Sequence, residues 1–153
     1  ENNGIKAAID LDWWQSITAN ETKITFVPAQ HWSARGIFDK REMLWGGFYI
    51  ENSHKIYFAG DTGYGKFFKT IKEKIGAYEP RWFMKDAHLN PKDSLKAFQD
   101  LESKKMFGIH FGTFKLTDEG YNDPMDTLRK EIQSLNMDAQ KVIIPTFGKP
   151  YSI

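Results

Sequence analysis

Three residues that can bind a metal ion each stand shortly after an apolar, β-rich run: His31, Asp61 and His110. Imidazole nitrogen and carboxylate oxygen suit Zn(II), Mn(II) or Fe(II). Such an ion would lower the pKa of a bound water to about 7 and so provide a nucleophile at neutral pH. The chain has four His and no Cys, so any metal must be held by imidazoles and carboxylates. The lack of Cys also excludes disulfide scaffolds, iron–sulfur clusters and a cysteine nucleophile.

The expected strands explain why these residues could meet. The runs 24–27, 55–59 and 106–109 are short and apolar, and each leads into one of the three residues. Ligand sites in layered α/β folds lie at strand ends, where the scaffold fixes a loop but leaves its polar groups uncovered. Taken singly, each histidine is better explained as an ordinary imidazole, so the repetition carries the hypothesis. His54 lies in a polar turn and is given no chemical role.

The segment 60–66, Gly-Asp-Thr-Gly-Tyr-Gly-Lys, offers a competing interpretation. It fits the first seven positions of the phosphate-binding loop G-x-x-x-x-G-K and lies between an expected strand and an expected helix. However, Phe67 stands where a hydroxyl must reach Mg²⁺, and Asp61 would place a carboxylate among amides meant for an anion. These departures disfavour nucleotide binding. A third interpretation, that Gly60 and Gly63 only form turns, stays open.

The remaining periodicity predicts alternating strands and helices. Apolar spacing predicts helices over 66–74, from Asn90-Pro91 through Leu101, and from Asp123-Pro124 onward. Alternation or short apolar runs predict strands over 5–11, 44–51 and 142–144, with a turn at 52–54 and a non-periodic loop over 77–88. This order of elements is typical of an α/β layered domain.

Composition excludes several classes of partner. The chain has 153 residues and a formal charge of +1, from 21 basic and 20 acidic residues. A chain of this length is expected to form one domain. Because its charges nearly cancel, the net charge does not indicate binding to nucleic acid or to an anionic membrane. No apolar run approaches the roughly 20 residues of a membrane span. We expect an excerpt of a soluble, cytoplasmic protein, with peripheral membrane contact left open because the aromatic residues suit either a core or a lipid-facing groove.

Several blocks of the sequence resemble one known family. The blocks are Pro-Ala-Gln-His-Trp at 28–32, Leu-Trp-Gly at 44–46, Phe-Ala-Gly-Asp-Thr-Gly-Tyr at 58–64, Gly-Ala-Tyr-Glu-Pro-Arg-Trp-Phe-Met at 76–84 and Ile-His-Phe-Gly-Thr-Phe at 109–114. In this order they resemble the metallo-β-lactamase-fold hydrolases related to N-acyl-phosphatidylethanolamine-hydrolysing phospholipase D. The resemblance extends from about residue 9 to residue 131.

The resemblance implies a four-layer αββα sandwich with a two-zinc centre at one edge of the sheets. By matching position, His31 would bind the first metal, Asp61 would bridge both, and His110 would bind the second. Asp61 and His88 would be catalytic, and His88, Tyr64 and Trp82 would contact the substrate. An alternative for His88, a loop imidazole that orders Asp86 or a carbonyl, stays open.

The chain also departs from that family in two places. The ligand block His-x-His-x-Asp-His is absent, so each metal would keep only two protein ligands, whereas zinc sites generally need three or four. At 74–76 the expected helix joins the next block directly, where the family carries a further strand. We therefore expect residues 1–153 to be the C-terminal part of a single domain that lacks one inner strand. The isolated chain should be marginally stable or patched by another chain.

The expected function follows from the family. It is metal-dependent hydrolysis of a phosphodiester in a phospholipid-like substrate, incomplete in the chain as given, with at most weak or partial zinc binding. A lactonase or another ester hydrolase of the same fold is the enzymatic alternative, because a fold does not decide its substrate. The other alternative is a non-catalytic remnant, or a half-domain that needs a separate N-terminal half or a second copy.

Overall fold

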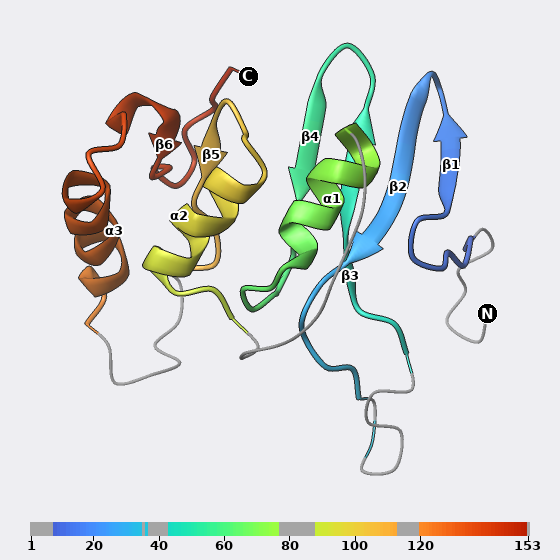
Figure 1. Cartoon of the computed structure of the whole chain (residues 1–153), viewed down its shortest axis with the longest axis horizontal. Coiled ribbons are helices and arrows are strands. Elements are labelled where there is room, and N and C mark those ends of the chain that lie inside the picture. Colours follow the sequence, from blue (N-terminus) through green and yellow to red (C-terminus); the bar gives the residue numbers. More distant parts are fainter. Residues whose placement is uncertain (1–7, 35, 37–42, 77–87, 113–119, 153) are drawn as a thin grey trace.

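The computed structural model describes residues 8–34, 36, 43–76, 88–112 and 120–152. Its larger sheet has four antiparallel strands in sequence order: β1 (Ser16–Ala19), β2 (Thr22–Pro28), β3 (Gly46–Glu51) and β4 (Lys55–Phe58). Figure 1 shows this sheet on one side of the molecule, with the other elements gathered beside it. The predicted strands 24–27, 44–51 and 55–59 are confirmed with boundary shifts of up to two residues, and the turn between β3 and β4 lies where the sequence predicts it.

The first predicted strand is wrong. Residues 8–12 form no strand, and Ile9 is 66% exposed, while residues 5–7 lie outside the described part of the chain. The strand instead forms over Ser16–Ala19, in a polar stretch that alternation did not indicate. It forms because the tight turn at Asn20 and Glu21, both at positive φ, folds it back onto β2. Strand pairing thus overrides local patterning.

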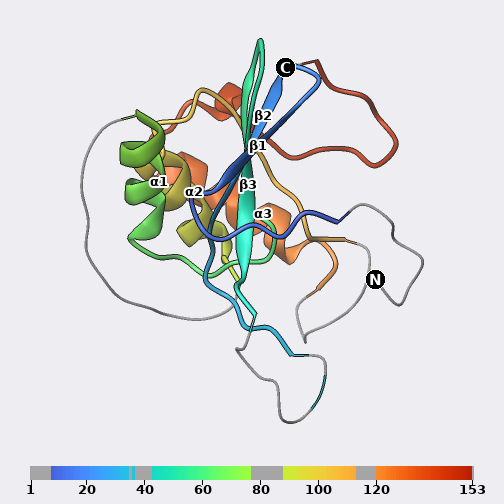
Figure 2. The ribbon, with the colours of Figure 1, turned by 90° about the vertical axis from the view of Figure 1, so that its right-hand side faces the viewer.

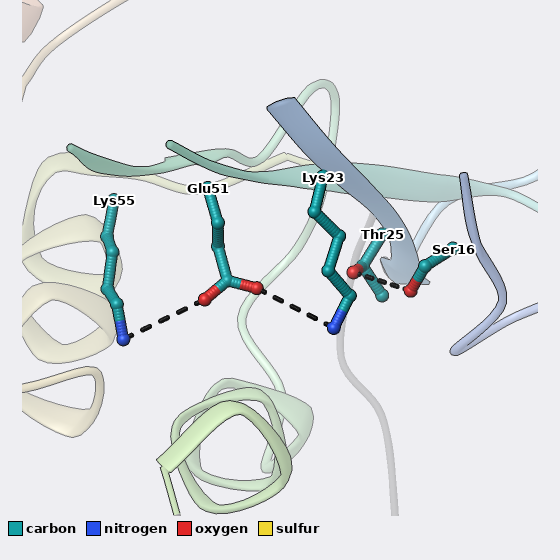
Figure 3. A network of polar contacts seen from close by, with 5 residues as sticks. All are labelled: Ser16, Lys23, Thr25, Glu51 and Lys55. Carbon is teal, nitrogen blue, oxygen red and sulfur yellow. Dashed lines mark hydrogen bonds and ion pairs between the residues drawn. The ribbon is translucent and has the colours of Figure 1, made fainter. Parts of the chain in front are cut away.

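Charged and polar side chains project from the face of this sheet that also carries Tyr49 (Figure 3). The Glu51 carboxylate lies 3.9 Å from the Lys23 ammonium and 3.7 Å from that of Lys55, so it bridges β2 and the start of β4. Ser16 Oγ and Thr25 Oγ1, 2.9 Å apart, join β1 to β2. These cross-strand pairs support the observed register.

Helix α1 (Phe67–Gly76) lies over one face of the sheet, as Figures 1 and 2 show. Its Ile71 packs with Val27 and Tyr49, which point to the same side of the sheet because their strands are in register. Ile71 and Val27 are fully buried, so this contact forms the core between α1 and the larger sheet.

The opposite face of the same sheet is also apolar. Side chains alternate across a strand, so the paired rows Ile24–Ile50–Ile56 and Phe26–Phe48–Phe58 share this second face. We call these six residues the open face. Phe58 is 50% exposed, and Phe48 and Ile56 also remain exposed. An antiparallel sheet with one solvated face normally carries polar residues there, so the open face is unusual for a surface.

The remaining elements form a second packing unit. Helices α2 (Pro91–Asp100) and α3 (Asp123–Ser134) pack together beside a parallel pair, β5 (Met106–Phe107) and β6 (Val142–Ile143), which follows the 3₁₀ turn η1 (Ala139–Lys141). Their shared core consists of Leu95, Phe98, Leu128, Ile132 and Val142. All three predicted helices are confirmed, and both short strands lie within their predicted runs.

The expected strand deletion stays a prediction. Helix α1 ends at Gly76, and residues 77–87 lie outside the described part of the chain. Within the described residues, β4 is an edge of the larger sheet and does not pair with β5. This division of the sheet is what the loss of a strand between them would produce. The described helices include none long and apolar enough to cross a membrane.

Candidate metal centre

Asp61, His88 and His110 lie close together, after β4, before α2 and after β5. Each offers one ligand atom, and these atoms lie within 4.8 Å of one another. His110 Nε2 is 3.2 Å from Asp61 Oδ1, and the His88 and His110 rings stack with centroids 5.5 Å apart. Two imidazoles and a carboxylate form a donor set that suits Zn(II), Mn(II) or Fe(II), so the residues present fit such an ion.

Asp61 is positioned by the turn that follows β4. Gly60 has a φ of +65°, a left-handed conformation that glycine adopts without strain. The indole Nε1 of Trp45 donates a hydrogen bond to the Asp61 carbonyl at 2.8 Å. These constraints fix the backbone, while the side chain of Asp61 remains about one-third exposed and able to bind.

The loops after β2 and β4 are bonded to each other just beside Asp61. The Thr62 hydroxyl accepts a hydrogen bond from the Gln30 amide at 2.9 Å, and the Gly63 amide donates to the Gln30 carbonyl at 2.9 Å. Thr62 is buried. The two loops therefore form one rigid platform, which places His31 near the cluster.

These bonds also weigh against a phosphate-binding loop at residues 60–66. A phosphate cradle needs free backbone amides, but the Gly63 amide already donates to Gln30. The Asp61 carboxylate lies against His110, and the Phe67 ring packs on Phe68 with centroids 4.4 Å apart.

His31 lies next to the cluster but is not part of its group of ligand atoms. Its Nδ1 is 3.0 Å from the Trp32 carbonyl, and since a carbonyl only accepts, Nδ1 carries the hydrogen. The ring stacks on Trp45 with centroids 4.6 Å apart and meets His88 edge-on at 5.1 Å. Its orientation is thus fixed by three neighbours.

His110 is held in a strained backbone conformation. Its φ is +66°, in the left-handed region, and Gly112 two residues later has a φ of +71°. A non-glycine residue in this region costs on the order of 1–3 kcal/mol, and such strain clusters at functional sites. Its side chain is 56% exposed, so the strain is not compensated by burial of the ring.

The structure does not bring the other predicted site residues into the cluster. The Tyr64 hydroxyl donates to Asp100, and the Lys96 ammonium lies 4.4 Å from the centroid of its ring, so its polar contacts are with α2. Burial first, then the bond to Asp100, raises the pKa of Tyr64 above its ordinary value. Trp82 lies outside the described residues. His54 is in the exposed β3–β4 turn, beside the Ser53 hydroxyl.

Trp45 is the residue whose role sequence reasoning missed. It bonds to Asp61 and stacks on His31, and its own carbonyl accepts from the Ala29 amide at 3.3 Å. The signal in the sequence was the position of Trp45 directly before Gly46. In the structure, Gly46 pairs with Pro28 at the end of β2. A Cβ at Gly46 would lie 2.5 Å from the Val27 carbonyl oxygen, so only glycine permits this approach.

The fold and the site together define a layered α/β domain with a candidate metal centre at its strand ends. The model of the beta-lactamase superfamily domain matches residues 1–111, and the chain belongs to this superfamily. The resemblance seen in the sequence is confirmed by relatives in two organisms. The mitochondrial N-acyl-phosphatidylethanolamine-hydrolyzing phospholipase D of Saccharomyces cerevisiae is 34% identical over 145 residues. N-acyl-phosphatidylethanolamine-hydrolyzing phospholipase D 1 of Caenorhabditis elegans is 37% identical over 145 residues.

These matches cover most of this chain but less than half of each relative. They span 83% of the chain and 31% of the yeast protein, and 84% of the chain and 41% of the nematode protein. Among solved structures, a putative metal-dependent hydrolase from Parabacteroides distasonis has a TM-score of 0.53 at 17% identity, covering 87% of this chain and 55% of that one. The fold class is therefore that of the metallo-β-lactamases, as predicted.

Proposed function

We propose that this chain is part of a metal-dependent hydrolase that cleaves a phosphodiester in a phospholipid-like substrate. The observation that carries the proposal is the group of Asp61, His88 and His110, whose ligand atoms lie within 4.8 Å of one another. The names of the yeast and nematode relatives support the substrate class. A lactonase or another ester hydrolase is the alternative within the same fold.

The residues have separate roles in this proposal. Asp61 and His110 hold the ion, and the resemblance gives His31 a further ligand position and His88 a place beside the substrate. When bound, zinc or a similar ion activates water for attack and polarises the bond to be cleaved. Trp45 holds the backbone at Asp61, and the stacked and bonded loops keep the ligands in place. The cellular location and the role of Trp82 stay predictions.

Product analysis tests this proposal. The purified chain, loaded with Zn(II), is incubated with vesicles containing N-acylphosphatidylethanolamine. Phosphodiester hydrolysis adds water across the head-group bond and releases phosphatidic acid and an N-acylethanolamine, whereas ester hydrolysis releases a fatty acid. Because the chain spans less than half of these relatives, we expect a low rate, but the first pair of products. Asp61→Ala should reduce this rate at least about 100-fold, since even residues that only support a ligand change activity by 10–100-fold.

His54→Ala is the matched control, since His54 lies in an exposed turn away from the cluster. Its rate should equal that of the unchanged chain. Fatty acid release would favour the ester hydrolase. If the chain retained no more metal after desalting than Asp61→Ala, it would be a non-catalytic remnant.

A second proposal concerns what covers the open face. The open face is a flat apolar surface that a folded sheet normally covers with a second layer. The chain also covers only 31% and 41% of the two relatives. We propose that the open face packs against a β-sheet supplied by an N-terminal half, as in an αββα sandwich. Stacked sheets of this kind lie about 10 Å apart.

Copurification tests this second proposal. The first half of the nematode relative is expressed separately and mixed with the tagged chain. We expect it to copurify, and Phe58→Lys to abolish this because a charge would enter the apolar layer. Tyr121→Lys is the control, since Tyr121 is 65% exposed and is not on the open face. A stable dimer of the chain alone, broken by Phe58→Lys, would show instead that a second copy occupies the face.

A further inference from the structure

His88 and His31 occupy positions that differ from those the resemblance implies. The resemblance makes His31 a metal ligand and places His88 beside the substrate. In the structure, His88 shares the group of ligand atoms with Asp61 and His110, and His31 does not. Residues 1–153 do not contain the His-x-His-x-Asp-His block that the family carries.

The spacing of the three groups suits one ion. A tetrahedral zinc site with ligand distances of about 2.0–2.2 Å places its ligand atoms about 3.3–3.6 Å apart. His110 Nε2 and Asp61 Oδ1 are already 3.2 Å apart, and the whole group fits within 4.8 Å. Binding therefore needs closure of little more than an ångström. Both imidazoles are exposed, so small rotations of their side chains can supply it.

His31 is held in place by its other contacts. Its Nδ1 hydrogen donates to the Trp32 carbonyl, and its ring stacks against Trp45 and Trp32, at 4.6 Å and 5.8 Å between centroids. The Nδ1 bond leaves Nε2 free, as in many metal-binding histidines, but His31 contributes no atom to the group of ligand atoms. A rotation that brought its ring into that group would break the contacts with Trp45 and Trp32. Its edge-on contact with His88, at 5.1 Å, instead suits a residue that positions the His88 ring.

We infer that Asp61, His88 and His110 form a single-ion site with three protein ligands, in which His88 is a ligand and His31 is a positioning residue. Three ligands with an open fourth position is the arrangement typical of catalytic zinc sites. The inference rests on the proposed metal dependence and gives residues 1–153 one ion, where the resemblance implies two. It also makes His88 a metal ligand, whereas the resemblance makes it a substrate contact.

The absence of Cys from the chain permits a direct test. His88→Cys places the only thiol of the protein at position 88, and the full chain is loaded with Co(II). A thiolate bound to Co(II) gives a ligand-to-metal charge-transfer absorption in the near ultraviolet that imidazole and carboxylate ligands do not give. We expect this absorption at one equivalent of Co(II) per chain. His54→Cys, in the exposed turn, should not produce it.

Affinity measurements complete the test. In Zn(II) titrations of the metal-free chain, His88→Ala and His110→Ala should each weaken binding at least about 10–100-fold, and His31→Ala should weaken it less. The far-ultraviolet circular dichroism of each variant shows that it still folds. No charge-transfer absorption in His88→Cys, two equivalents bound, or a loss for His31→Ala equal to that for His110→Ala would overturn the inference. These readouts do not depend on hydrolysis, so a failure of the proposed activity alone leaves them unchanged.

Discussion

At the scale of single residues, Trp45 connects the scaffold to the candidate metal centre. Its Nε1 hydrogen bond fixes the carbonyl of Asp61, and its ring supports His31. Groups that orient metal ligands without touching the ion commonly change metal affinity by 10–100-fold. The candidate metal centre therefore includes Trp45 as well as the residues that would bind the ion.

Trp45→Phe should weaken Zn(II) binding about 10-fold while keeping the aromatic contact with His31. The reason is that the Asp61 carbonyl loses its donor, so the carboxylate is less well oriented. Isothermal titration with Zn(II) measures the change.

Trp13→Phe provides the matched control for this substitution. Trp13 Nε1 also donates to a backbone carbonyl, that of Trp45, at 3.0 Å. Each variant should lose about 1 kcal/mol of folding stability, typical of one hydrogen bond. Equal Zn(II) affinity in both variants would contradict the role given to Trp45.

At the scale of elements, the helices show how residues at a helix N-terminus determine where the helix begins. Helix α2 begins as predicted because the Asn90 side chain accepts from the Asp93 amide at 2.8 Å and Pro91 occupies the first turn. Helix α3 also begins near Asn122 and a proline, but its Asn122 side chain makes no cap bond.

Asn90→Ala should lower the free energy of unfolding by about 1 kcal/mol, since it removes an N-cap. Asn122→Ala, the same substitution without a cap bond to lose, should have a smaller effect. Urea unfolding followed by circular dichroism measures both. The cap argument fails if the two variants lose the same stability.

The same comparison shows which parts of the fold and the site were predictable. Helices with caps and strand ends beside Asp61 and His110 could be predicted, because their signals are local in sequence. Strand β1 could not, since it depends on pairing with β2. The resemblance predicts His88 at the site, but sequence spacing could not show that its ring lies within the group of ligand atoms.

At the scale of the whole molecule, Tyr64 links the two packing units. Its ring stacks on Phe68 of α1 with centroids 5.9 Å apart, and its hydroxyl donates to Asp100 of α2. Lys69 of α1 adds an ion pair to the same carboxylate at 3.5 Å. We expect the isolated chain to be marginally stable, so the loss of one of these contacts should change its free energy of unfolding measurably.

The free energy of unfolding should fall as the pH rises above about 10, the ordinary pKa of tyrosine. Burial raises the pKa of Tyr64, as it does for Tyr57 and Tyr49. The folded state therefore holds these protons more tightly, and this contribution is present below the unfolded pKa and lost above it. Tyr64→Phe should reduce the fall, with the remainder due to Tyr57 and Tyr49. Denaturant titrations at several pH values measure this, and an unchanged slope would contradict it.

The backbone at His110 has a consequence for which substitutions the chain tolerates. At a φ of +66° glycine is the residue that folding alone favours, and asparagine, aspartate and histidine follow it. A selection for folded protein should therefore enrich glycine at position 110, whereas a selection for metal binding should recover histidine. Opposite preferences at one position would separate the demands of the fold from those of the site, without any assay of the reaction.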